Sequence, residues 1–297
     1  MKSSVLIQLD PDSPASTFDS VVAIDSGVDQ LLVRQGVTPE TVDGLVHGAM
    51  FTRGPQDLHR TAIFIGGSAV AASEALAERT LSCFFGPMRV SVMMDPNGSN
   101  TTAAAAVLCV QRHLDLAGRR VLILGGTGPV GQRIAGILAR ATGASGLTID
   151  LASRSLQRAT DCCRDLQSNV PSETATFCPV EIQAPEQATA AQAQADILFA
   201  AGAAGVELID DGWRQADKLQ VAVDLNAVPP AGIRGVEAMD HGESRDGTTC
   251  YGPIGVGGLK MKIHRQAIRQ LFEANDQVLD TDAIYGLGRE LESDTGA

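Results

Sequence analysis

Short apolar runs alternate along the chain with longer segments in which apolar residues recur at helical spacing. Seven runs have the length and β-branched composition of strands, and they span 5–9, 62–67, 89–94, 120–126, 147–152, 195–200 and 221–225. Helix-period segments lie between them at 68–81, 101–114, 128–141 and 154–168. Near-continuous apolar strands that alternate with helices predict parallel sheets covered on both faces, which is an α/β fold.

The order of these segments predicts two domains, as does a length of 297 residues. Residues 106–254 contain enough strand–helix units for one Rossmann-type, doubly wound parallel sheet. Residues 1–105 carry strands and helices of their own. A Gly-rich crossing segment then leads into a long amphipathic stretch, so we expect 255–297 to form helices that return to the first domain and make that α/β domain discontinuous.

Composition narrows the range of partners. A formal net charge of -12 argues against nucleic acid and anionic membranes, and an anionic ligand would need a local basic site. The apolar run near the N-terminus is too short for a signal peptide, and no stretch has the ~20 apolar residues of a membrane span. The six cysteines lack a C-x-x-C pair and the five histidines are scattered, so neither disulfides nor a metal is expected. We expect a cytoplasmic protein.

The segment after the run 120–126 has the pattern of a dinucleotide-binding turn. Gly126, Gly128 and Gly131 have the spacing G-x-G-x-x-G between a predicted strand and a predicted helix. The pattern assigns the tight turn to Gly126, close approach of a pyrophosphate to Gly128, and close helix packing to Gly131. Proline is favoured in the first turn of a helix, which suits Pro129. The predicted contacts are Gly126, Thr127, Gly128, Pro129, Val130 and Gly131.

The end of the next strand predicts which dinucleotide binds. NAD enzymes usually place an acidic residue there, and Asp150 comes two or three residues too early. The strand is followed by Ser153, Arg154 and Ser155, with Arg158 one turn later, and these groups suit a 2′-phosphate. The sequence therefore predicts NADP, with NAD as the weaker alternative. Gly202 and Asn226 end two further strands and are predicted to approach the cofactor.

Patterns for proton-transfer chemistry are missing from the sequence. The Tyr-x-x-x-Lys arrangement of short-chain reductases is absent, because Tyr251 is followed four residues later by Gly255 and Tyr285 by Arg289. This favours a hydride transfer that needs little acid–base help, such as oxidation of a carbon flanked by nitrogens.

Six blocks of sequence together resemble NAD(P)-dependent methylene-tetrahydromethanopterin dehydrogenases, a family with members that act on methylene-tetrahydrofolate. The blocks are 16–29, 62–67, 95–106, 125–133, 224–237 and 252–265. They cover nearly the whole chain in order, and the only departure noted is Val256 in the G-V-G-G-L-K block.

The resemblance implies reversible oxidation of the methylene bridge to the methenyl cation with NADP, in an active-site cleft between the two domains. It implies a catalytic role for Lys260. It also implies a set of substrate-binding residues: Asp19, Asn97, Ser99, Asn100, Thr102, Lys262 and His264. Helix capping is an alternative role for the 99–102 block. Methylene-tetrahydrofolate as a main or additional substrate and a non-catalytic NADP(H)-binding regulator remain alternatives, and we expect a homo-oligomer.

Overall fold

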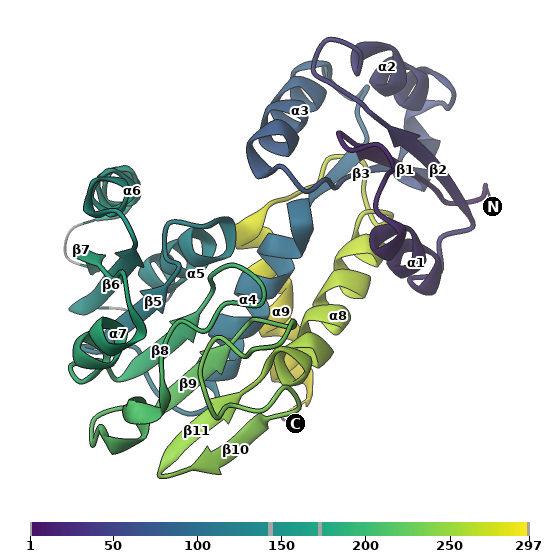
Figure 1. The fold of residues 1–297 in the computed structure, drawn as a ribbon. Coiled ribbons are helices and arrows are strands. Elements are labelled where there is room, and N and C mark those ends of the chain that lie inside the picture. Colours follow the sequence, from purple (N-terminus) through teal and green to yellow (C-terminus); the bar gives the residue numbers. More distant parts are fainter. Residues whose placement is uncertain (1, 142–144, 172–173, 296–297) are drawn as a thin grey trace. The chain divides into compact units, whose positions relative to one another are not determined.

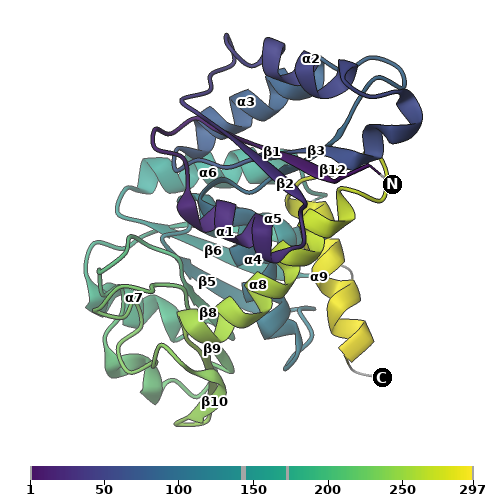
Figure 2. The ribbon, with the colours of Figure 1, turned by 90° about the vertical axis from the view of Figure 1, so that its right-hand side faces the viewer.

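The chain folds into two compact units, which the computed structural model describes for residues 2–141, 145–171 and 174–295 (Figures 1 and 2). The first, here called the N-terminal unit, combines 1–101 with 261–297. The second, the central unit, is 102–260. The division falls inside two helices, α4 (Ser99–Gln111) and α8 (Pro253–Gln270), so each of these helices contributes to both units.

The N-terminal unit is built on a five-stranded parallel sheet in the order β12-β4-β3-β1-β2. Its strands are β1 (Val5–Asp10), β2 (Gln30–Gln35), β3 (Thr61–Ile65), β4 (Ser91–Met94) and β12 (Val278–Leu279). Its other helices are α1 (Thr17–Asp25), α2 (Asp43–Phe51), α3 (Val70–Ser82), α9 (Thr281–Thr295) and the 3-10 turns η1 (Pro55–Arg60) and η2 (Pro96–Gly98).

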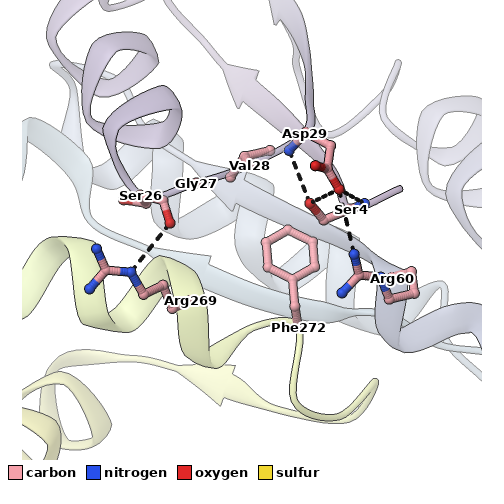
Figure 3. Close-up of a pocket in the computed structure, with 8 residues that line it drawn as sticks. All are labelled: Ser4, Ser26, Gly27, Val28, Asp29, Arg60, Arg269 and Phe272. Carbon is pink, nitrogen blue, oxygen red and sulfur yellow. Dashed lines mark hydrogen bonds and ion pairs between the residues drawn. The ribbon is translucent and has the colours of Figure 1, made fainter. Parts of the chain in front are cut away.

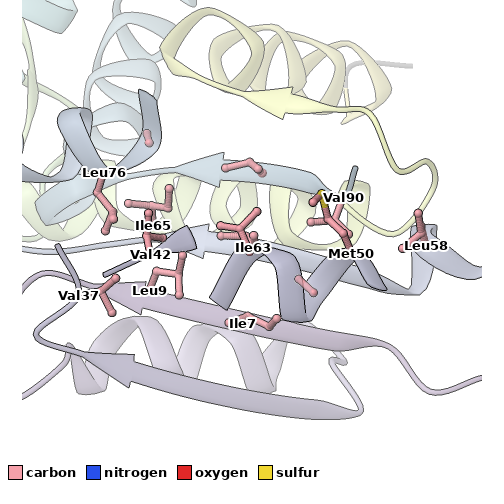
Figure 4. Close-up of a cluster of buried hydrophobic side chains, with 14 residues drawn as sticks. Ile7, Leu9, Val37, Val42, Met50, Leu58, Ile63, Ile65, Leu76 and Val90 are labelled. Carbon is pink, nitrogen blue, oxygen red and sulfur yellow. The ribbon is translucent and has the colours of Figure 1, made fainter. Parts of the chain in front are cut away.

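This unit has three layers, because alternate side chains of its strands point to opposite faces of the sheet and helices cover both faces. Ile7 and Ile63 point toward α2 and α3, where they pack with Met50 and Leu76 in one core (Figure 4). Full burial of one such side chain contributes about 1.5–3 kcal/mol to the stability of the folded state. Figure 2 shows α1 and the C-terminal part of α8 on the other side of the sheet.

The central unit is built on a seven-stranded sheet in the order β10-β11-β9-β8-β5-β6-β7. The strands are β5 (Arg120–Leu124), β6 (Leu147–Ser153), β7 (Ala175–Glu181), β8 (Ile197–Ala200), β9 (Val221–Asp224), β10 (His241–Arg245) and β11 (Thr248–Tyr251). The helices are α5 (Pro129–Arg140), α6 (Leu156–Ser168), α7 (Pro185–Gln192) and the 3-10 turn η3 (Asp211–Gln215).

Strand order in the central unit reverses between β5 and β8. All neighbouring strands are parallel except β10 and β11, which form an antiparallel pair. In open α/β sheets a ligand binds outside the carboxyl ends of the strands at such a switch point. The predicted fold class, α/β with a doubly wound parallel sheet and a discontinuous N-terminal α/β part, is confirmed.

The Gly-rich segment before Lys260 is not the predicted crossing loop, because residues 253–270 form the single helix α8. Close packing explains two of its glycines, Gly252 and Gly255. A Cβ on Gly252 would overlap the carbonyl oxygen of Glu237, and one on Gly255 would overlap that of Asp240. The first turn of α8 therefore lies directly on the segment before β10, and only glycine fits there.

Replacing Gly255 by alanine is expected to destabilise the protein by about 2 kcal/mol or more, because the new methyl group would force the helix away from the Asp240 carbonyl. Gly258→Ala is the matched control: its Cβ would meet nothing within 4 Å, so a helix-interior alanine is expected to stabilise by about 0.5–1 kcal/mol. Urea unfolding of both variants measures the two changes. Equal stability of the two variants would contradict this account.

Candidate functional site

The turn after β5 has the shape of a dinucleotide-binding loop, with one correction to the predicted roles. The left-handed residue is Gly125, with φ at 72°, and not Gly126. A Cβ on Gly126 would lie 2.8 Å from Leu151, so this residue permits contact with β6. A Cβ on Gly131 would lie 2.7 Å from the Gly125 oxygen, so this glycine lets α5 pack closely on the turn itself and not on the sheet as predicted.

The N-terminus of α5 is suited to an anion. Its N-cap is Gly128, which offers no side chain to the first-turn amides, and Pro129 is the first helical residue. Uncapped amides and the helix dipole favour a negative group at this position. The residues present therefore fit the pyrophosphate of a dinucleotide.

The end of β6 carries the polar groups predicted to select the cofactor. The hydroxyls of Thr127 and Ser153 are 3.4 Å apart, which links this strand end to the turn after β5. Ser155 caps α6 by accepting a hydrogen bond from the Arg158 backbone N–H, and the side chains of Arg154 and Arg158 are exposed. The arginines are thus accessible to an anionic ligand.

Asp150 is engaged elsewhere. Its carboxylate, which is nearly buried, accepts hydrogen bonds from Nε and Nη2 of Arg120 at 2.6 and 2.9 Å. Because it lies within β6 and is paired, its role is to hold two strands together, which agrees with its exclusion as a ribose ligand.

The loops after β8 and β9 are tied to each other. The Gly205 N–H donates to the side-chain oxygen of Asn226 at 3.0 Å, and the Asn226 amide donates to the Pro230 carbonyl at 2.9 Å. Gly202 lies against Gly125, where a Cβ on Gly125 would be 2.6 Å from the Gly202 Cα. The predicted cofactor residues of four strand ends therefore meet at one edge of the central sheet.

A buried carboxylate that the sequence analysis missed supports these loops. Asp224, the last residue of β9, is fully buried and accepts hydrogen bonds from the backbone N–H groups of Asn226 and Ile233. Burial raises the pKa of Asp224, and these N–H donors counteract the rise.

In the N-terminal unit, predicted residues gather at the carboxyl ends of β1, β3 and β4. Oδ2 of Asp19 lies 2.9 Å from the point that a Cβ on Gly66 would occupy, so a side chain at that strand end would displace it. The ring of His264 stacks on Phe64 with centroids 5.7 Å apart. Asp19 and His264 are both buried.

Residues of the 97–102 block differ in their exposure to solvent. Ser99 and Asn100 are fully buried: the Ser99 hydroxyl donates to the Pro96 carbonyl, and the Asn100 side chain bonds with Met94 and Thr281. Asn97, by contrast, is exposed with φ at 52°. Ser99 and Asn100 thus shape the turn, and substrate contact by this block stays a prediction that falls mainly on Asn97 and the half-buried Thr102.

The cap of α4 is Asp95, a residue that sequence reasoning did not single out. Its carboxylate accepts hydrogen bonds from the N–H groups of Asn100 and Thr101 and from the Thr101 hydroxyl, at 2.8, 3.1 and 2.6 Å. An aspartate directly before a helix that follows a strand is the signal that could have found it.

Helix α8 carries the remaining predicted residues. Lys260 is half-buried, Lys262 is exposed, and His264 is fully buried one turn after Lys260. Lys260 and His264 lie four residues apart and so share one side of the helix.

A pocket of about 270 Å³ lies at the amino ends of β1 to β3, where Phe272 faces Val28 and Arg60 meets Asp29 (Figure 3). This is the sheet edge opposite the predicted substrate residues. Within the described ranges, no three His, Cys, Asp or Glu side chains gather in a way that could hold a metal, and no helix there has the length and apolar character needed to cross a membrane.

Comparison with known proteins decides the family. Residues 17–97 match the family model "Methylene-tetrahydromethanopterin dehydrogenase, N-terminal". The chain is 40% identical to the bifunctional protein MdtA of Methylorubrum extorquens, over 98% of this chain and 100% of that protein. The chain belongs to the methylene-tetrahydromethanopterin dehydrogenase family. A second member from that organism, the NAD(P)-dependent methylenetetrahydromethanopterin dehydrogenase, is 33% identical over 98% of this chain and 99% of its own length. The resemblance read from the sequence is thereby confirmed.

Solved structures with a similar fold are more distant from this family member. Aspartate transcarbamoylase from Trypanosoma cruzi with phosphate superposes with a TM-score of 0.58 at 13% identity, covering 93% of this chain and 85% of that one. A putative aspartate carbamoyltransferase of Leishmania major gives 0.55 at 14% identity, covering 93% and 84%. At this identity the likeness concerns the two-unit α/β fold alone.

Replacing Asp150 by asparagine is expected to cost about 1–3 kcal/mol of stability without weakening NADP binding by more than about twofold, because Asp150 accepts two hydrogen bonds from Arg120 inside the sheet. The matched control is Asp161→Asn, which breaks an exposed pair with Arg164 and is expected to cost less than about 0.5 kcal/mol. Urea unfolding and NADP titration measure both effects. A large loss of NADP affinity in Asp150→Asn would return Asp150 to the cofactor site.

Proposed function

We propose that this protein is an NADP-dependent methylene-tetrahydromethanopterin dehydrogenase of one-carbon metabolism, which reversibly oxidises the methylene bridge to the methenyl cation. The observation that carries the proposal is the family membership over 98% of the chain, together with an uncapped glycine turn at the switch point of the central sheet. We further propose that it acts in the cytoplasm as a homo-oligomer.

The central unit is assigned to the dinucleotide. Gly128 leaves room for the pyrophosphate at the start of α5, where the amides of Val130 and Gly131 come next in the helix. The loops held by Asn226 and Gly205 would orient the nicotinamide end. The bound dinucleotide supplies the hydride acceptor.

We assign pterin binding to residues that the family resemblance implies. They are Asp19, Asn97, Thr102, Lys260 and Lys262. Two nitrogens flank the reacting carbon and stabilise the cation that is formed, so the protein mainly has to orient the ring and exclude water. A lysine ammonium beside the forming cation would oppose the oxidation. We therefore assign Lys260 to orienting the pterin from one side of the reacting carbon.

Preference for NADP over NAD is assigned to the groups after β6. Arg154 and Arg158 are exposed, and β6 itself ends in Ser153 rather than in an acidic residue. The neighbouring Glu181 of β7 is engaged by the Leu156 backbone N–H, which it accepts at 3.3 Å. A guanidinium can donate paired hydrogen bonds to a 2′-phosphate, which NAD lacks.

The test is an anaerobic spectrophotometric assay of the purified protein. It uses methylene-tetrahydromethanopterin and methylene-tetrahydrofolate, each with NADP and with NAD, and follows the methenyl product. We expect turnover with methylene-tetrahydromethanopterin and NADP. Greater turnover of the folate substrate would move the assignment to that substrate. Tight NADP binding with no product from either pterin would favour the non-catalytic regulator.

Arg154→Ala is expected to raise the KM for NADP by about 10- to 100-fold and to leave the KM for NAD within about twofold, because a charge-assisted hydrogen bond contributes about 1.5–3 kcal/mol. Arg164→Ala is the matched control: Arg164 is exposed on α6, the helix that follows Arg154, and pairs with Asp161. Steady-state kinetics with both cofactors decide the matter. An equal rise for NADP and NAD would remove Arg154 from 2′-phosphate recognition.

A further inference from the structure

We propose that Asp95 and His264 are a pair of positioning residues for the dehydrogenase reaction, coupling the start of α4 to the orientation of α8. Neither residue is expected to touch the substrate. This inference rests on the proposed function and adds to it the device that sets the geometry of the predicted pterin-binding residues.

The first step is the placement of Asp95. Its carboxylate follows β4, is fully buried, and holds the start of α4 through the three hydrogen bonds from Asn100 and Thr101. The Asp95 backbone also accepts a hydrogen bond from Gly98, and Asn97 donates to the Gly67 carbonyl. Asp95 thereby fixes the turn that exposes Asn97.

The second step is the contact between Asp95 and α8. Oδ2 of Asp95, which accepts the Thr101 hydroxyl, lies 3.8 Å from Nδ1 of His264, within ion-pair distance. Both side chains are completely buried. The separation is too long for a hydrogen bond, so the two groups interact through the electrostatics of a buried, weakly screened site, in which displacing either one is costly.

The third step is the restraint on helix rotation. The His264 ring also stacks on the Phe64 ring, with the two centroids 5.7 Å apart and an angle of 25° between the ring planes. His264 lies against Phe64 of β3, Asp95 after β4 and the Phe18 ring of α1, whose centroid is 6.4 Å away, so a rotation of α8 would have to displace it from all three. Lys260 lies one turn earlier on the same side of α8, so its direction depends on the same contacts.

Such a restraint matters because hydride transfer depends on alignment. A misplacement of about 1 Å at the reacting groups can cost about 100-fold in rate. Loosening the pair is therefore expected to lower kcat, while the KM for NADP, whose predicted contacts lie in the central unit, stays nearly constant.

The experiment compares kcat, both KM values and Tm for the wild type and a set of variants of the full chain. The set is Asp95→Asn, His264→Leu, the double variant Asp95→Asn/His264→Leu, His264→Asn and Asp196→Asn. In His264→Asn the side-chain amide can occupy the position of Nδ1. Asp196→Asn is the matched control, since Asp196 is also buried and accepts a backbone N–H, from Arg120, at the amino edge of the central sheet.

We expect Asp95→Asn and His264→Leu each to lower kcat by at least about tenfold, with the KM for NADP within about threefold. The double variant should be no slower than the slower single one, because the two residues act together. His264→Asn should recover most of the rate. Asp196→Asn should keep kcat within about twofold while losing a comparable amount of Tm.

Three results would overturn the inference in an active wild-type enzyme: kcat unchanged in both single variants, losses that multiply in the double variant, or no recovery in His264→Asn. If one of the singles fails to fold, the other and His264→Asn still decide. A wild-type protein that does not oxidise either pterin would instead overturn the proposed function itself.

Discussion

Buried carboxylates at the ends of parallel strands are the constraint on which both predicted binding regions depend. Asp10 ends β1, Asp95 follows β4, and Asp224 ends β9, and all three are completely buried. Each accepts hydrogen bonds from two backbone N–H groups of the segment that follows its strand. Loops that leave a sheet edge expose N–H groups that must be satisfied, and a carboxylate satisfies two of them from one point. The cost of burying the charge is offset only while those loops keep one conformation.

The same arrangement connects packing to the predicted chemistry. The Asp10 carboxylate accepts the N–H of Ser16, the N-cap of α1, and this helix start presents Asp19 beside Gly66. In the central unit Asp224 holds the segment in which Asn226 receives the Gly205 N–H. Asp10 and Asp224 therefore hold the loops from the interior. Asp19 and Asn226, which are predicted to bind ligand, lie in the segments that these carboxylates hold.

Much of the fold could be predicted from the sequence because seven strands are apolar on both faces, and all seven are present. The strands that were missed lack that pattern for physical reasons. β2 is an edge strand with mostly exposed side chains, and β7 contains Pro179, which only an edge strand tolerates. The glycine turn was predicted because its chemistry is local in sequence. The close approach of Gly202 to Gly125 was not predicted, because these residues are distant in sequence and only the fold brings them together.

The candidate site shows the same division between local and distant causes. Spacing alone places Lys260 and His264 on one side of a helix, but only the fold shows that His264 is buried between Phe64 and Asp95. The family resemblance implies a catalytic role for Lys260 and substrate binding by His264, although a completely buried ring can act on a ligand only through its neighbours. In α8, packing therefore holds the buried His264, and the half-buried Lys260 lies one turn earlier. In the proposed arrangement the rigid packing of His264 sets the position of Lys260, a dependence that spacing in the sequence does not show.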